Sequence, residues 1–219
     1  VYFYWAKIFF YLIIHGKKMI IKIANKIKNE IVYLIRKKRY GKLCKSNRLK
    51  KPLLISGEKN IFLHEHVFIR EGARIECISS WQNQKFSPKL EIDYNTSFEQ
   101  DLHLICANHV KIGSNCVFSA RVFISDLNHD YTDINKCVMK QPLIVKDIEI
   151  GDGCFVGYGV CILPGVHLGR HCIVGANSVV TRSYSDYCVL AGNPAICIKR
   201  YDSGAKMWKK TDKFGNFIN

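Results

Sequence analysis

Residues 150–180 read IGDGCFVGYGVCILPGVHLGRHCIVGANSVV, and this stretch decides the fold. A branched aliphatic residue recurs at every sixth position, namely at Ile150, Val156, Ile162, Leu168, Val174 and Val180. An α-helix repeats every 3.6 residues or so and a plain strand every two, so a period of six indicates a repeat architecture.

Three such hexads form one triangular coil, with a short strand on each side and the aliphatic residue pointing inward. The position four residues after each aliphatic also points inward, and it holds Cys154, Val160, Val166, Cys172 and Ser178. This pattern predicts an all-β fold, a left-handed parallel β-helix in which each coil buries its face on the next.

The same period is present earlier in the chain, where it is weaker. The aliphatic and aromatic residues six apart are Leu63, Ile69 and Ile75, then Ile92, Phe98 and Leu104, then Ile112, Phe118 and Ile124. A polar loop at 81–89 and a long excursion at 125–147 interrupt the repeats. Loops that leave a rigid scaffold are where binding and catalysis concentrate, so the excursion is the predicted functional segment.

The basic character of the chain belongs to its N-terminal part. Residues 1–60 contain sixteen Lys and Arg against two acidic residues, while the remaining chain is nearly neutral. Nucleic acid is therefore a poor candidate for the partner of the repeat domain. Residues 19 to about 40 predict an amphipathic helix with an apolar stripe (Ile20, Ile23, Ile27, Ile31, Leu34, Ile35) opposite lysines and arginines. The helix either caps the open end of the solenoid or docks on anionic lipid headgroups.

The first fourteen residues are apolar but shorter than the roughly eighteen that a membrane span needs, and they lack the features of a signal peptide. Because Met19 opens a coherent segment, we expect residues 1–18 to be upstream sequence or a truncated start. Cys116, Cys154 and Cys172 occupy inward positions, where cysteine acts as a small apolar side chain. No C-x-x-C pair occurs, which argues against a structural zinc site. The use of cysteine as a core residue favours a reducing cytoplasm. The expected domains are a basic helical extension (1–54), the β-helix (55–201) and a basic tail (202–219).

Several motifs resemble those of a known family. They are Phe123–His129 (FISDLNH), Ile150–Gly157 (IGDGCFVG), Ile162–Val166 (ILPGV), Val174–Thr181 (VGANSVVT) and Ala191–Ala195 (AGNPA). In this order they resemble the hexapeptide-repeat acyltransferases, specifically the branch of galactoside, maltose and xenobiotic acetyltransferases and surface-polysaccharide O-acetyltransferases. The resemblance covers roughly residues 55–201.

The resemblance implies a homotrimer that binds acetyl-CoA in clefts between subunits, without a required metal. His129 matches the histidine of the protruding loop, the general base that takes the proton of an attacking sugar hydroxyl. Asp126, Asp130 or Asp133 would orient its ring, although local turns account for these aspartates equally well.

The resemblance also assigns binding residues. Asp126, Asn128 and His103 are the expected acceptor contacts, and the expected contacts of the acyl donor are Tyr158, Gly159, Ala176, Thr181, Lys199 and Arg200. Ile196 stands where some relatives have an arginine, which puts one phosphate contact in doubt.

We therefore expect an acetyl-CoA-dependent O-acetyltransferase that modifies a cell-surface polysaccharide precursor, in the cytoplasm or at the inner face of the plasma membrane. A sugar N-acetyltransferase is the nearest competing function, because an amine acceptor needs the same base. Two more distant functions are a zinc hydratase of the γ-carbonic anhydrase type and a non-catalytic membrane or nucleic-acid binder.

Overall fold

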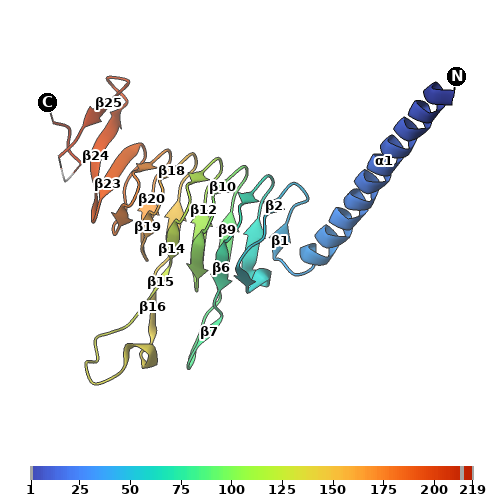
Figure 1. Cartoon of the computed structure of the whole chain (residues 1–219). Helices are drawn as coiled ribbons and strands as arrows, with labels where there is room; N and C mark the ends of the chain where they lie inside the picture. Colours follow the sequence, from blue (N-terminus) through green and yellow to red (C-terminus); the bar gives the residue numbers. More distant parts are fainter. Residues whose placement is uncertain (1, 213–214, 219) are drawn as a thin grey trace. The chain divides into compact units, whose positions relative to one another are not determined.

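The computed structural model describes residues 2–212 and 215–218, with side chains described from residue 19 onward. The chain divides into two compact units, residues 1–39 and residues 40–219. The first unit consists of helix α1 (Tyr2–Lys37), and the second contains every strand (Figure 1). The expectation that residues 1–18 are upstream sequence concerns a segment that is described only in part. Residue 1 lies outside the described residues, and the side chains of residues 2–18 are not described.

Helix α1 begins well before the predicted start at residue 19, and its amphipathic pattern is as predicted. Each member of the apolar stripe is exposed, from 51% at Ile23 to 64% at Ile20. Within the described residues, no helix combines the length and the apolar character that crossing a membrane requires.

The second unit is a left-handed parallel β-helix of six coils, built on three sheets. Sheet A stacks β1 (Lys42–Leu43), β4 (Ile61–Leu63), β9 (Lys89–Ile92), β12 (His109–Ile112), β17 (Ile148–Ile150) and β20 (His167–Leu168). Sheet B stacks β2 (Arg48–Leu49), β5 (Phe68–Ile69), β10 (Ser97–Phe98), β13 (Val117–Phe118), β18 (Phe155–Val156) and β21 (Ile173–Val174). Sheet C stacks β3 (Leu54–Ser56), β6 (Arg74–Cys77), β11 (His103–Cys106), β14 (Phe123–Ser125), β19 (Cys161–Ile162) and β22 (Val179–Val180).

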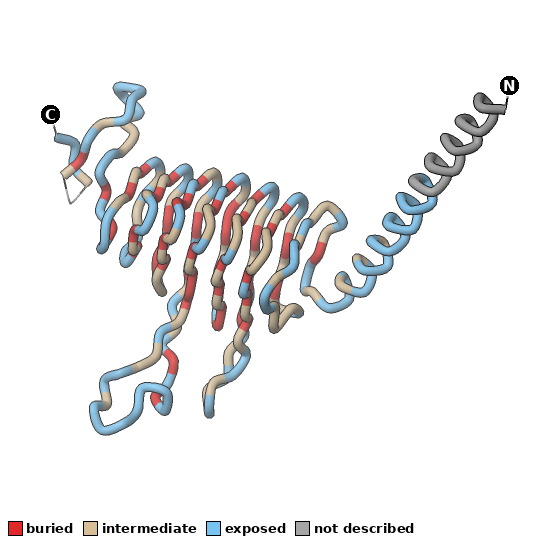
Figure 2. The backbone as a smooth tube through the Cα atoms, in the orientation of Figure 1, coloured by how far each residue is buried: buried red, intermediate tan, exposed pale blue. Residues whose placement is uncertain are grey.

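The register of the coils confirms the predicted hexads. Ile150 pairs with Leu168, Val156 with Val174 and Ile162 with Val180, and every one of these six residues is at most 2% exposed. The secondary inward positions, Cys154 to Ser178, are equally buried. Buried residues recur along every coil in Figure 2, so the core is the continuous interior of the solenoid.

Close contact between coils explains the small residues that follow the inward aliphatics. A Cβ atom added at Gly157 would lie 2.7 Å from the Ala176 nitrogen, and one at Gly151 would lie 2.8 Å from the Arg170 nitrogen. Both distances are well below van der Waals contact, so a side chain there would separate the coils. The hexad pattern thus encodes both the core and the spacing of its layers.

All ten cysteines are free thiols, and seven of them are buried. Cys116, Cys154 and Cys172 follow one another on successive coils, each at most 1% exposed, which confirms their prediction as small core residues. Hydrogen bonds to Cys116 and Cys172 and burial raise the pKa of the Cys154 thiol, so this thiol stays protonated.

The β-helix extends further in both directions than predicted. Its first coil begins at Lys42 rather than at residue 55, because the period is already present at Leu43, Leu49 and Ile55. An end coil has only one neighbouring coil, and charged residues at its other positions weaken the pattern. Part of the predicted basic tail, Met207–Lys210, likewise pairs into sheet B. There β23 (Cys188–Gly192), β24 (Ala195–Asp202) and β25 (Met207–Lys210) form an antiparallel extension.

Candidate functional site

The excursion between β14 and β17 begins as a two-stranded ribbon. In it β15 (Leu127–His129) pairs antiparallel with β16 (Leu143–Val145), so that His129 lies opposite Leu143. A 3-10 helix (Val138–Lys140) lies near its tip; the other 3-10 helix, Glu58–Asn60, precedes β4. The ribbon projects from the coils as a protruding loop in Figure 1.

Asp126 anchors the root of the protruding loop. Its side chain is completely buried, and its carboxylate accepts hydrogen bonds from the backbone N–H groups of Ala107 and Asn108, at 2.8 Å each. Burial raises the pKa of the Asp126 carboxyl, and the same N–H donors oppose that rise because they favour the ionised form. The carboxylate, predicted as an acceptor contact, therefore faces the backbone of the neighbouring corner.

His129 is half-buried at the end of β15. Its ring lies edge-to-face against the indole of Trp81, with the two centroids 5.1 Å apart and the planes at 74°. The Nδ1 atom of His129 is buried and has no hydrogen-bond partner in the described part of the chain. An unpartnered imidazole nitrogen is costly unless a ligand or proton exchange uses it, which marks this residue as a site candidate.

Trp81 belongs to a short hairpin in the segment that was predicted as a polar loop. Strands β7 (Ser80–Trp81) and β8 (Gln84–Lys85) pair antiparallel, and the hairpin is docked on the protruding loop. The Gln84 side chain bonds both backbone groups of Leu143: its Nε2 donates to the carbonyl at 3.1 Å, and its Oε1 accepts from the N–H at 2.7 Å. Trp81 donates from Nε1 to the Gln141 carbonyl at 3.3 Å. The hairpin thus holds the strand opposite His129.

One signal in the sequence could have identified this hairpin. Both interruptions of the repeat leave from sheet C and return to sheet A, the first between β6 and β9 and the second between β14 and β17. Insertions at the same corner of a triangular solenoid emerge on the same side. Assigning each hexad to its sheet therefore predicts that the hairpin and the protruding loop lie next to each other. Figure 1 shows β7 and the ribbon of β15 and β16 on that common side.

The tip of the protruding loop is held by Gln141, which is only 2% exposed. Its Nε2 donates to the carbonyls of Asp133 and Lys136, each at 3.0 Å, and its Oε1 accepts from the Asp133 N–H at 3.1 Å. These bonds give a long surface segment a defined shape. No pattern in the sequence signals this buried polar residue.

Asp130 and Asp133 make local turns rather than contacts with His129. The Asp130 carboxylate accepts from the Thr132 N–H at 2.9 Å, which lowers the pKa of Asp130. Asp133 accepts from the Asn135 N–H at 3.0 Å and pairs with Lys136 at 2.8 Å. Of the two accounts left open for these aspartates, turn formation is the one that matches these contacts.

His103 lies on the outer face of sheet C, in edge-to-face contact with Phe123 at 5.3 Å. Its Nε2 atom is buried and lacks a partner within the described residues, as Nδ1 of His129 does. Burial lowers the pKa of His103, and the nearby Arg74 guanidinium lowers it further. Across the described residues, no hydrogen bond or ring contact joins His103 to His129. Asn128 is exposed on β15, opposite Ile144.

Four of the residues that were predicted to contact the acyl donor lie along one side of the solenoid. Tyr158 and Gly159 form the corner between sheets B and C, Ala176 occupies the next coil of that corner, and Thr181 follows β22. The Tyr158 ring is 43% exposed, with the Arg121 guanidinium 5.9 Å from its centroid. The structure therefore lines these residues up as an open surface rather than a closed pocket.

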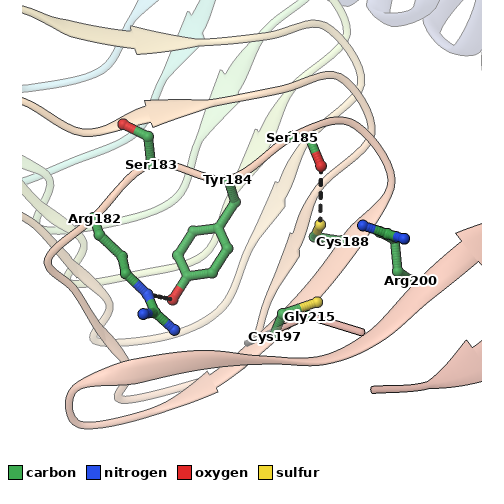
Figure 3. Close-up of a pocket in the computed structure, with 8 residues that line it drawn as sticks. All are labelled: Arg182, Ser183, Tyr184, Ser185, Cys188, Cys197, Arg200 and Gly215. Carbon is green, nitrogen blue, oxygen red and sulfur yellow. Dashed lines mark hydrogen bonds between the residues drawn. The ribbon is translucent and has the colours of Figure 1, made fainter. Parts of the chain in front are cut away.

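The two predicted basic contacts, Lys199 and Arg200, are neighbours on β24 and point to opposite faces of it. Arg200 lines a pocket of about 260 Å³ at the C-terminal end of the coils. Figure 3 shows its lining, which is Arg182, Ser183, Tyr184, Ser185, Cys188, Cys197, Arg200 and Gly215. Lys199 does not line this pocket. Ile196 lies just after the turn that joins β23 to β24 and is 37% exposed.

Among the described residues, no three His, Cys, Asp or Glu side chains are grouped so as to hold a metal ion.

Residues 147–182, which form the last two coils, match the family described as "Bacterial transferase hexapeptide (six repeats)". A galactoside O-acetyltransferase of Lactococcus lactis is 27% identical over 168 residues, which are 73% of this chain and 72% of that protein. An Escherichia coli K12 protein that carries the name of a lipopolysaccharide biosynthesis O-acetyl transferase is 34% identical over 124 residues. That alignment covers 53% of this chain, which spans less than two thirds (63%) of the length of the E. coli protein.

Two solved structures share the fold. The N-acyltransferase AntD from Bacillus cereus, in complex with dTDP and 3-hydroxybutyryl-CoA, gives a TM-score of 0.63 at 15% identity, over 78% of this chain and 88% of that one. A maltose O-acetyltransferase from Clostridium difficile 630 gives a TM-score of 0.50 at 23% identity, over 77% and 74%. At these identities the likeness establishes the β-helix. Residues 147–182 carry the hexapeptide repeat of bacterial transferases, and the sequence relatives reported above are named as acetyltransferases.

Proposed function

We propose that this chain transfers an acetyl group from acetyl-CoA to a hydroxyl of a saccharide, with His129 as the general base. The observation that carries the proposal is the position of His129, half-buried at the root of the protruding loop and with an unpartnered nitrogen. The resemblance of FISDLNH to the family's histidine motif, and the O-acetyltransferase names of the sequence relatives, support the acceptor class. By the same analogy the acceptor is a cell-surface polysaccharide precursor.

His129 supplies what the reaction lacks. A sugar hydroxyl is a weak nucleophile, and a neutral imidazole takes its proton as the oxygen attacks the thioester carbonyl. The new C–O bond forms, the C–S bond of the tetrahedral intermediate breaks, and the proton passes from His129 to the departing thiolate. Trp81 packs edge-to-face against the ring and so limits its freedom to turn, which lowers the cost of ordering the base for the reaction.

The direct test is release of CoA from acetyl-CoA across a panel of saccharides with the purified chain. We expect His129→Asn to lower turnover by about 10²–10⁴-fold, the usual contribution of a positioned base. His167→Asn is the matched control, because His167 is an exposed histidine whose ion pair with Glu149 is on the solenoid surface. Equal turnover of His129→Asn and the unaltered chain would remove His129 as the base.

The same panel separates the two acceptor classes. Amino sugars in place of hydroxyl acceptors would be the better substrates if the chain were an N-acetyltransferase. We expect the reverse, with the unmodified sugars turned over faster.

We also propose that the active assembly is a homotrimer, as the family resemblance implies. The predicted donor contacts support this, because Tyr158 and Thr181 form an open surface that a neighbouring subunit would turn into a cleft. Sedimentation velocity tests it: a monomer that retains full turnover would contradict it.

Finally, we propose that α1 attaches the enzyme to the inner face of an anionic membrane, in the cytoplasm. The exposed apolar stripe and the opposing lysines of α1 support this, and the ten free thiols are compatible with a reducing compartment. Cosedimentation of the full chain with vesicles tests it: binding to phosphatidylglycerol vesicles should fall with added salt and with Ile27→Asp plus Ile31→Asp. Equal binding to purely zwitterionic vesicles would refute the electrostatic part.

A further inference from the structure

A second cleft, of about 540 Å³, lies at the C-terminal end of the β-helix, at a different corner from the protruding loop. It is lined by His171, Tyr187, Tyr201, Ser203 and Trp208. His171 comes from the corner between sheets A and B, whereas Tyr201 and Trp208 face each other across β24 and β25. The cleft is therefore built by joining the last coil to the antiparallel extension, a segment that the repeat pattern does not contain.

The aromatic rings of this cleft keep part of their faces free. Tyr187 is 39% exposed and Trp208 is 36% exposed. The rings of His171 and Trp208 lie at 27° to each other with centroids 6.4 Å apart, near the upper limit for an aromatic pair. Tyr201 meets Trp208 by its edge, at 5.6 Å and 69°. Tyr187 also contacts His171 and Tyr201, each at 6.0 Å, so the four rings form one cluster whose Tyr187 and Trp208 remain partly exposed.

The polar atoms of the cleft are also unused. Within the described part of the chain, no hydrogen bond engages the side-chain polar atoms of His171, Tyr187, Tyr201, Ser203 or Trp208. Each of these side chains except serine presents a flat apolar body with one polar edge. Such groups suit a ligand that has apolar faces and many hydroxyls at its rim.

The lining contains no Lys, Arg, Asp or Glu. Two ion pairs lie on the flanking segments, Arg170 with Asp186 at 2.8 Å and Lys209 with Asp202 at 2.7 Å. An anionic ligand such as a nucleotide or a phospholipid headgroup would find no dedicated partner in this lining. An uncharged ring is the chemistry that the lining fits.

We propose that this cleft binds an uncharged hexopyranose unit of a saccharide chain. The C–H face of the sugar would lie on Trp208 or Tyr187, and its hydroxyls would bond the free polar edges of the lining. Binding requires only the cleft. Its use as a second holding point for a polymeric acceptor rests on the proposed function, and it would let the enzyme favour long acceptors over short ones by multivalency.

The test is a titration of the full chain, labelled with ¹⁵N, with neutral methyl hexopyranosides and their disaccharides. The indole N–H resonance of Trp208 is identified by its loss in Trp208→Phe. We expect a saturable shift of that resonance, with a midpoint independent of any shift at Trp81, which lies against His129. Affinities of the variants are compared by isothermal titration calorimetry, because variants at position 208 lack the indole resonance. Trp208→Ala and Tyr187→Ala should each weaken binding by about tenfold or more, which corresponds to the loss of one aromatic contact of about 1.4 kcal/mol. Trp208→Phe, which keeps a flat ring, should retain most of the affinity.

Tyr131→Ala is the matched control, because Tyr131 is an exposed tyrosine on the protruding loop. Absence of a saturable shift with every neutral saccharide would overturn the proposal. So would a shift produced by uridine or adenosine alone, or one produced only by raising the protein concentration, which would indicate a contact between copies. The transfer assay is separate: Trp208→Ala should keep turnover of a monosaccharide acceptor and lose the preference for a longer one. A chain that binds saccharides at Trp208 but transfers no acetyl group would refute the proposed function. The proposal that the cleft binds a sugar would be unaffected.

Discussion

Removing the Gln84 side chain should disable the enzyme without unfolding it. Gln84 makes two hydrogen bonds to the backbone of Leu143, the residue opposite His129. A hydrogen bond of this kind contributes about 1 kcal/mol net, so Gln84→Ala should destabilise the docked loop by about 2 kcal/mol. Because Leu143 is only 5% exposed, its backbone groups would be poorly solvated once Gln84 is gone.

If only the docked conformation of the loop is catalytically competent, destabilising it by about 2 kcal/mol lowers kcat by about thirtyfold at most. The hairpin and the loop lie outside the coils, so the midpoint of thermal unfolding should change little. Gln82→Ala is the matched control, because Gln82 bonds the exposed Met139 carbonyl from the same turn. We expect that variant to keep kcat within about twofold, since an exposed bond is readily replaced by water.

The assay is acetyl transfer at saturating acetyl-CoA, together with the NMR titration of the His129 ring, which reports its surroundings even without turnover. Trp81→Phe provides a second perturbation, because it keeps a ring against His129 and deletes the hydrogen bond to Gln141. A Gln84→Ala enzyme with unaltered kcat and an unaltered His129 titration would refute the idea that the hairpin holds the loop. Equal losses in Gln82→Ala and Gln84→Ala would contradict the assignment of the effect to the two bonds between Gln84 and the buried Leu143.

Three further predictions concern the scaffold. Val156→Asp should prevent folding, since it places an unpaired charge at a fully buried position, whereas Phe155→Asp at the next, outward position should fold; circular dichroism of both variants checks this. All ten cysteines lie in the described residues, and Cys137 alone among them is exposed. One thiol should therefore react quickly with a disulfide reagent under native conditions, and Cys137→Ser should abolish that fast reaction. The folded-state pKa of His103 lies below its unfolded value of 6.5, so the unfolded chain binds the proton first as the pH falls. Stability should therefore decrease as the pH drops through about 6.5, less steeply in His103→Gln; denaturant unfolding at several pH values measures this slope.

The sequence predicted the coils well because each hexad repeats one local rule. A buried aliphatic such as Val156 and a glycine such as Gly157 satisfy packing and spacing within the same six residues. The rule weakens at the ends, where a coil has one neighbour, and most of the first coil, from Lys42, and strand β25 were assigned to flanking segments instead.

The site was predicted only in part, for a physical reason. His129 was found through its motif, and its environment depends on contacts between segments about sixty residues apart, such as Trp81 with Gln141. A glutamine that bonds a distant backbone group, as Gln84 does, has no local signature. Asp126 is the opposite case, since its motif was recognised but its role was not. The sequence suggested a contact with the acceptor, whereas the buried carboxylate bonds the backbone at Ala107.

The protruding loop leaves at Ser125 and re-enters at Ile148, on strands of consecutive coils. Its two ends are therefore fixed at neighbouring points of the stack whatever length of chain joins them. Insertions and deletions there leave the hexad register intact, while a single added residue within a coil would displace every inward side chain after it. Changes of length and sequence can therefore accumulate in this one segment without a change in the scaffold.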